Sequence, residues 1–205
     1  SRKLTMNTAK YSFFLMLLLS LPIYVVAKPL LELWLVNVPP YTIIFLQLIV
    51  LQSLFSTLDT CFYTGLYACG KVRTNALISP LVLSLQFPII YIAFKLGCSP
   101  VFLSYTGIAV TIILAMIVKP ILLIKLAGFS GKDIESVFVP CVKVSIVAFV
   151  PSLIAAKFLS GNYLQYALLV IIVIAFVFLS VFYIGIEKEQ RNELVSIIKK
   201  KLLHL

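Results

Sequence analysis

Residues 163–186 read YLQYALLVIIVIAFVFLSVFYIGI, a run of 24 residues without a single Asp, Glu, Lys or Arg. A helix needs roughly 20 apolar residues to cross a hydrocarbon core of about 30 Å, and this run meets that length. Its residues do not alternate strictly between apolar and polar, as the strands of a membrane β-barrel would. The run therefore predicts a transmembrane α-helix.

The rest of the chain has a similar composition. Of its 205 residues, 62% are hydrophobic and 12% are charged, whereas a soluble domain is about 45–50% apolar and 25% charged. Such a small number of polar residues cannot cover the surface of a globule in water. The surrounding solvent must therefore be largely lipid. Five more segments are long and apolar enough to span: 11–27, 41–66, 76–94, 101–118 and 137–156. We predict an all-α integral membrane protein with a six-helix lobe over residues 1–186.

The basic residues indicate an orientation. The chain has 17 Lys and Arg against 7 Asp and Glu, a net charge of +10. If every segment crosses the membrane, only three basic residues, Lys28, Lys95 and Lys157, lie on the side opposite the two chain ends. The positive-inside rule then predicts that both ends are cytoplasmic. Because the charge is spread along one membrane face, it does not predict nucleic-acid binding.

The end of the chain, residues 187–205, predicts a basic amphipathic helix. Five apolar residues recur there at helical spacing, and Lys199, Lys200 and Lys201 lie largely on the other side: Leu194, Ile197, Ile198, Leu202 and Leu205. Such a helix fits the surface of an anionic membrane, and a docking tail for a partner protein is the alternative.

Polar residues within the second span form a stripe. Gln52, Ser56, Asp59 and Tyr63 occur at i, i+4, i+7 and i+11, which places them on one helix face. A carboxylate at the centre of a membrane helix costs about 2.5–3.5 kcal/mol, so Asp59 should face the bundle interior, a cavity or a basic partner. It is either a cation- or proton-coupling site, an orienting partner for a basic side chain, or a structural residue that is protonated or paired.

Two weaker stripes accompany this one. They consist of Ser79 with Gln86 in the third span and Ser12 with Ser20 in the first. Such residues either line a shared cavity or hold helices together by hydrogen bonds. Lys143, inside the fifth span, is expected to extend its amine toward the cytoplasmic interface.

Groups for enzymatic chemistry are missing from the predicted spans. They contain no His, no paired carboxylates and no Ser with an acid or base companion, so we predict that the chain is not an enzyme and has no cofactor. The four cysteines show no CxxC spacing, and the single His is His204, so no metal site is predicted. We expect the thiols to behave as small buried hydrophobes.

Three stretches of the chain resemble a known family. They are PLLELWL at 29–35, GLYACGKVRTN at 65–75 and YIGIEKEQR at 183–191. Together they resemble the O-antigen and polysaccharide flippases of the multidrug/oligosaccharidyl-lipid/polysaccharide exporter superfamily. Relatives of these flippases are the multidrug exporters of the MATE type and the lipid II flippases. The resemblance covers essentially the whole chain.

The resemblance implies a MATE-like transporter of about 12 to 14 helices in two pseudo-symmetric lobes, of which this chain would hold the last six. A start at Ser1 rather than Met fits that implication. The implied substrate is an undecaprenyl-pyrophosphate-linked oligosaccharide, moved across the bacterial inner membrane by alternating access for lipopolysaccharide or other surface polysaccharide. A polysaccharide polymerase or assembly protein is an implied partner.

The resemblance also suggests roles for particular residues. Lys71 and Arg73 would recruit the diphosphate, with Lys119 and Lys143 as further candidates at the cytoplasmic mouth, while Gln52, Ser56 and Tyr63 would meet sugar hydroxyls. No Arg lies in the middle of a predicted span, which departs from the family's pattern and favours the other lobe as the place of its deep cationic site. Two other functions remain open: a cation-coupled multidrug or metabolite exporter of the same fold, and a membrane scaffold that transports nothing.

Overall fold

The computed structural model describes residues 2–159, 161–186 and 191, and all regular secondary structure in those residues is helical. Six of its helical segments are long and apolar enough to cross a membrane: Arg2–Val25, Thr42–Ala68, Val72–Lys95, Phe102–Ala127, Gly131–Phe158 and Tyr163–Gly185. For the described residues, this confirms the prediction of an all-α chain with six segments able to span a membrane. The predicted amphipathic tail, 187–205, lies outside the described residues except for Arg191.

The helices are longer than hydropathy predicted in five of the six spans, and the sixth ends one residue earlier than predicted. They are α1 (Arg2–Val25), α2 (Ala27–Trp34), α3 (Thr42–Ala68), α4 (Val72–Ser84), α5 (Gln86–Lys95), α6 (Phe102–Ile113), the π-helix η1 (Leu114–Val118), α7 (Lys119–Ala127), α8 (Gly131–Phe158), α9 (Tyr163–Ser180) and the π-helix η2 (Val181–Gly185). The first span begins at Arg2 rather than residue 11, and the fourth ends at Ala127 rather than residue 118. A charged residue ends an apolar run in the sequence, but the helical backbone hydrogen bonds continue beyond that residue.

Some predicted span boundaries are consequently wrong. Residues 28–40, which lie between the first two predicted spans, contain most of the short helix α2. Lys119, placed by hydropathy after the fourth span, lies inside that helical segment and is 2% exposed. Lys143 likewise lies near the middle of α8, on its exposed face, because α8 begins at Gly131 rather than at residue 137.

Glycine and a capping box define the turns at which the chain reverses. Gly70, Gly97 and Gly128 have φ values of 68°, 81° and 70°, a left-handed conformation that costs glycine little because it has no Cβ. At the start of α8, the Ser130 hydroxyl accepts a hydrogen bond from the Lys132 backbone N–H at 3.0 Å, and Asp133 accepts one from the Ser130 N–H at 2.8 Å. These local signals account for the short connections.

Proline accounts for the break within the third span. Pro88 has no N–H to donate to the carbonyl of Ser84, four residues earlier, and α4 ends at that serine before α5 begins at Gln86. The third span is therefore two helices joined at Leu85. Pro22, Pro140 and Pro151 lie inside helices that continue through them.

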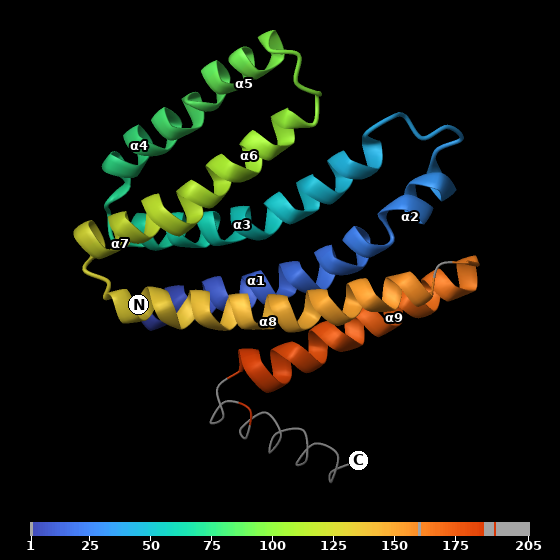
Figure 1. Ribbon diagram of the computed structural model, residues 1–205. Helices are drawn as coiled ribbons and strands as arrows, with labels where there is room; N and C mark the ends of the chain where they lie inside the picture. Colours follow the sequence, from blue (N-terminus) through green and yellow to red (C-terminus); the bar gives the residue numbers. More distant parts are fainter. Residues whose placement is uncertain (1, 160, 187–190, 192–205) are drawn as a thin grey trace.

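The helices form a stacked series in which neighbours lie side by side (Figure 1). α1 packs against α3 on one side and against α8 and α9 on the other, while the α6–α7 segment packs on the far side of α3. The α4–α5 segment is outermost and meets the rest mainly through α3, η1 and α6. We call the end of the bundle with the α3–α4 turn the Lys71 end, and the end with α2 the Trp34 end.

The apolar core is concentrated between α1, α3 and α8. Leu17, Phe62 and Val144 are fully buried there, and the Phe62 ring meets Phe138 edge-on with centroids 5.8 Å apart. The α4–α5 segment differs, since only 6% of its most apolar stretch is buried, against 44% in α1 and 50% in the fourth span. One side of the bundle is tightly packed and the other is nearly uncovered.

Candidate functional site

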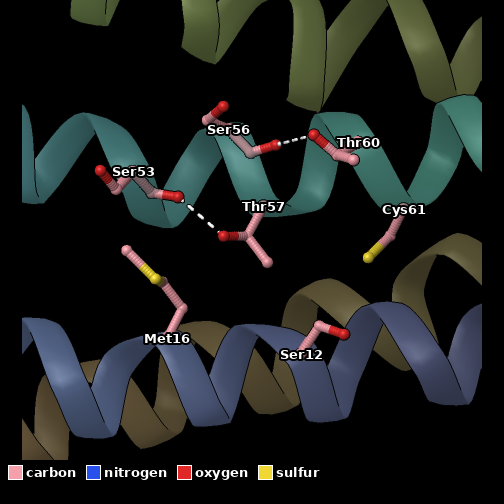
Figure 2. Close-up of a pocket in the computed structure, with 7 residues that line it drawn as sticks. All are labelled: Ser12, Met16, Ser53, Ser56, Thr57, Thr60 and Cys61. Atoms are coloured by element: carbon pink, nitrogen blue, oxygen red, sulfur yellow. Dashed lines mark hydrogen bonds between the residues drawn. The ribbon is translucent and has the colours of Figure 1, made fainter.

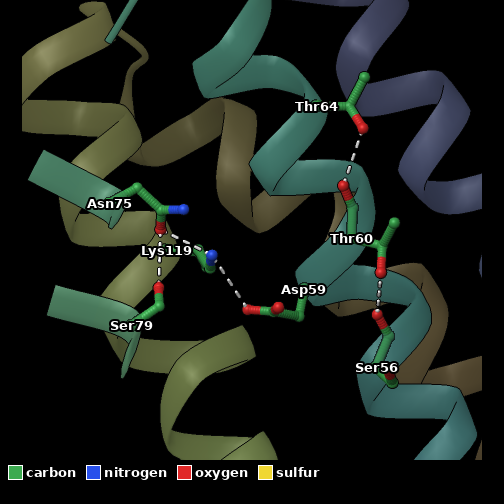
Figure 3. A network of polar contacts seen from close by, with 7 residues as sticks. All are labelled: Ser56, Asp59, Thr60, Thr64, Asn75, Ser79 and Lys119. Carbon is green, nitrogen blue, oxygen red and sulfur yellow. Dashed lines mark hydrogen bonds and ion pairs between the residues drawn. The ribbon is translucent and has the colours of Figure 1, made fainter. Parts of the chain in front are cut away.

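The most polar interior contact joins three spans through Lys119 (Figure 3). Its Nζ atom lies 3.6 Å from Asp59 Oδ1 on α3 and donates a hydrogen bond of 2.6 Å to Asn75 Oδ1 on α4. The Ser79 hydroxyl donates to the same amide oxygen at 2.8 Å. The ammonium also lies 5.2 Å from the centre of the Tyr63 ring. We call these five residues the Lys119 cluster.

The cluster is asymmetric in its access to solvent. The Lys119 side chain is 3% exposed, whereas that of Asp59 is 26% exposed. An ammonium without a counter-charge would be expensive at such a depth, so Asp59, Asn75 and the Tyr63 ring together explain why a lysine is tolerated there. The Asp59 carboxylate and the Tyr63 ring, which is 38% exposed, are parts of the cluster that a ligand can reach.

A π-turn aims Lys119 at this position. The Lys119 N–H bonds the carbonyl of Leu114, five residues earlier, and Pro120 follows with no N–H of its own. Lys119 comes eight residues after Thr111, so in a regular α-helix the two would point roughly 80° apart at 100° per residue. The extra residue of the π-turn brings both side chains toward α3.

Thr111 belongs to a second polar contact nearer the Trp34 end. The Gln52 amide donates to the Thr111 hydroxyl at 3.0 Å, and that hydroxyl donates to the Gly107 carbonyl at 2.8 Å. A Cβ atom at Gly107 would stand 3.5 Å from the Gln52 amide and 3.6 Å from that of Gln86 on α5. Polar side chains thus join α3 to the fourth span at two levels, roughly 10 Å apart along α3 at 1.5 Å per residue.

A groove runs between α1 and α3 on another side of α3 (Figure 2). It has a volume of about 410 Å³, and seven uncharged residues line it: Ser12, Met16, Ser53, Ser56, Thr57, Thr60 and Cys61. Ser12 and Met16 point toward it from α1, and the others belong to α3. We call it the α1–α3 groove.

The hydroxyls of α3 mainly offer acceptors. Those of Ser53, Thr57, Thr60 and Thr64 each donate to the carbonyl four residues earlier, at 2.8–2.9 Å. Each hydroxyl has one donor and two acceptor lone pairs, so these bonds use the donor and leave the lone pairs available. The groove is therefore suited to a ligand that donates many hydrogen bonds and carries no negative charge where it sits.

The predicted stripe on α3 divides between these features. Asp59 and Tyr63 lie in the Lys119 cluster, Gln52 bonds Thr111, and Ser56 lines the α1–α3 groove. Lys71 and Arg73 are exposed at the α3–α4 turn and first turn of α4, outside the Lys119 cluster. Of the weaker stripes, Ser79 belongs to the cluster and Ser12 to the groove.

Sequence reasoning missed Lys119 as a partner of Asp59, and it missed Asn75 and Thr111 entirely. One signal was present: Lys119 precedes a proline within a run whose apolar character resumes immediately with Ile121, Leu122 and Leu123. Asn75 and Ser79 also stand at i, i+4, a spacing that puts them on one face.

Among the described residues, no three His, Cys, Asp or Glu side chains gather as a metal site would require. The cysteines are less buried than expected, since Cys69 and Cys98 are exposed, Cys61 is half-buried and Cys141 is buried. Comparison with protein families, with curated proteins and with solved structures found no match to this chain.

Proposed function

We propose that this chain is one lobe of a membrane transporter that moves a lipid-linked oligosaccharide across the bacterial inner membrane by alternating access. The observation that carries the proposal is the α1–α3 groove, whose hydroxyl lone pairs suit sugar hydroxyl groups. Its uncharged lining also suits a neutral glycan. The acceptor-rich surface lies on helices that are otherwise apolar enough to sit in lipid.

Lys71 and Arg73 supply the second part of the proposal. Both are exposed at one end of the bundle, where the positive-inside rule puts the cytoplasm. A diphosphate linked to the sugar carries negative charge that such side chains attract, and Arg can bind phosphate through two parallel hydrogen bonds. The headgroup would be captured at this end while the glycan enters the groove. Polymerase or assembly proteins would then use the delivered repeat unit.

The groove is tested by removing its hydroxyls. We expect the triple variant Ser53→Ala, Ser56→Ala and Thr60→Val to reduce surface polysaccharide per copy of protein in the membrane. Ser84→Ala is the matched control, because its hydroxyl also bonds the carbonyl four residues earlier but lies outside the groove. Full polymer display by the triple variant would refute transport through the groove, and would favour a non-transporting scaffold.

Capture of the headgroup is tested by removing two basic residues at a time from the same end of the bundle. Lys71→Ala with Arg73→Ala should lower polymer display, while Lys125→Ala with Lys132→Ala, which removes two exposed charges from the same end, should not. Equal losses in both double variants would indicate that total charge, rather than capture at Lys71 and Arg73, matters.

A cation-coupled exporter is the second candidate, and the Lys119 cluster favours it. A partly exposed carboxylate balanced by an internal ammonium can exchange that partner for a proton or metal cation. For this function, Asp59→Asn should abolish the dependence of transport on pH or sodium, and the full chain should restore drug resistance rather than polymer display. An unchanged dependence would leave Asp59 with a structural role.

A further inference from the structure

The stretch PLLELWL, singled out in the sequence, forms most of α2, and neither transport proposal uses it. Only Val26 separates α2 from α1, and the carbonyls of Pro22 and Val26 accept hydrogen bonds across that junction. Figure 1 shows α2 at the end of the bundle where α3 begins and where α8 turns into α9. The helix therefore lies at the level where the spans end.

Three faces run along α2. Ala27 and Leu31 are buried against the bundle, and Lys28 forms an exposed ion pair with Glu32, 3.9 Å apart. The third face is apolar and uncovered, with Leu30 42%, Leu33 70% and Trp34 83% exposed. A helix with one packed, one charged and one open apolar face fits a boundary between water and lipid.

The space beside the apolar face is itself apolar. A gap of about 270 Å³ separates α2 from the start of α9, and its lining consists of Val26, Pro29, Leu30, Leu33, Tyr163, Tyr166, Ala167 and Val170. Water in this gap would meet almost no hydrogen-bonding partner, whereas acyl chains would fill it favourably.

Aromatic side chains mark the same level on neighbouring helices. Tyr41 precedes α3, Phe158 ends α8 and Tyr163 begins α9, and they are 47%, 82% and 67% exposed. Trp and Tyr gather at membrane interfaces because their rings prefer the headgroup region and their polar atoms remain hydrogen-bonded there. Trp34 continues this belt.

We propose that α2 is a lipid-binding helix at the membrane–water interface, with Leu30 and Leu33 in the upper acyl region, Trp34 among the headgroups and the Lys28–Glu32 pair toward water. Lys28 is then placed to meet lipid phosphate. The occupant of the apolar face is membrane lipid, not a partner protein or a second copy of the chain. The proposal does not depend on what the protein transports.

The chain contains one tryptophan, so Trp34 reports on this helix without labelling. The full chain is reconstituted in phosphatidylcholine and phosphatidylglycerol vesicles, and its fluorescence is quenched by lipids brominated near the carbonyl end or near the methyl end of the acyl chain, and by aqueous acrylamide. We expect a blue-shifted emission, the strongest quenching by the shallow bromines and weak quenching by acrylamide.

Variants separate lipid contact from shielding by protein. Leu30→Lys with Leu33→Lys should increase acrylamide quenching and weaken bromine quenching, whereas Glu32→Gln, which changes a water-facing side chain of the charged face, should leave both unchanged. Strong acrylamide quenching with no bromine effect in the unchanged chain would overturn the proposal by placing Trp34 in water. Strongest quenching by the deep bromines, or protection from both quenchers, would overturn it in favour of a transmembrane position or a protein-covered face.

Discussion

The two sides of α3 differ in what holds them together. Toward α1 and α8, α3 contributes Leu54, Leu58, Phe62 and Leu66 to a close-packed apolar core. Toward the α6–α7 and α4–α5 segments, the Lys119 cluster and the Gln52–Thr111 bond provide the prominent polar links. Apolar packing holds both sides, since Ala115, Leu122 and Leu123 of the fourth span belong to the same core, and on the second side polar contacts of the kind that join membrane helices are added to it.

The difference identifies which part of the molecule can move with little loss of contact. The α4–α5 segment loses little packing if it shifts, because only 6% of its most apolar stretch is buried, and the Asn75–Lys119 hydrogen bond links it to the bundle near the Lys71 end. Moving α1 away from α3 would instead open the core. For the proposed transport function, we expect a cycle that spares the core and breaks polar contacts.

The largest contrast is expected between two phenylalanines. Phe62→Ala empties a fully buried site and should lower the free energy of unfolding by about 3–5 kcal/mol. Phe87→Ala on α5, where the side chain is 76% exposed, should change it by less than about 0.5 kcal/mol. Unfolding of the purified chain in mixed detergent micelles, titrated with dodecyl sulfate, measures both. Equal losses would contradict the distinction between the two sides.

The next largest effect should come from the Lys119 cluster. Lys119→Met leaves Asp59 without its counter-charge, and we expect a loss of about 3 kcal/mol, at the low end for a buried pair because Asp59 is 26% exposed. Adding Asp59→Asn should recover most of the lost free energy of unfolding, since the uncompensated carboxylate is removed. The same titration of both variants measures the interaction energy between Lys119 and Asp59. A double variant no better than Lys119→Met would show that Asp59 is not the partner that matters.

A smaller loss is expected where helices approach closely. A Cβ atom at Gly185 would stand 2.7 Å from the buried Phe14 ring, so Gly185→Ala should destabilise the packed side by about 1–3 kcal/mol. Gly131→Ala, with no atom within 4 Å of its added Cβ, is the control and should lose nothing. Comparable stability of the two variants in the titration would mean that the α1–η2 contact is loose.

The smallest effect should be found at the edge of the Lys119 cluster. Ser79→Ala removes one hydrogen bond to Asn75 and should cost about 0.5–1 kcal/mol, because Lys119 still donates to the same oxygen. Ser84→Ala should be neutral by comparison, since its exposed hydroxyl bonds only its own helix. The same titration compares Ser79→Ala and Ser84→Ala with the unchanged chain. If Ser79→Ala lowered the free energy of unfolding more than Gly185→Ala does, Ser79 would be a central member of the cluster and not a peripheral one.

Much of the fold was predictable because each span satisfies its own backbone. In lipid, every N–H and C=O must be paired within its helix, so an apolar run of sufficient length determines a helix whatever its neighbours are. The reversals at Gly70, Gly97 and Gly128 were likewise predictable, because glycine readily adopts the positive φ that these turns have. Helix ends were not, because hydrogen bonding continues past residues such as Lys119 that hydropathy takes as the end of a span.

The sequence alone thus determined an all-helical chain with six potential spans, and it identified Asp59 as a side chain that needs a partner. Only the tertiary structure decided that the partner is Lys119, 60 residues away, and that α4–α5 is left nearly uncovered. Hydropathy and helix formation are set by neighbours in the chain. The Asp59–Lys119 pair depends on a single-residue change of register at the π-turn and on how three helices pack, which local sequence does not encode.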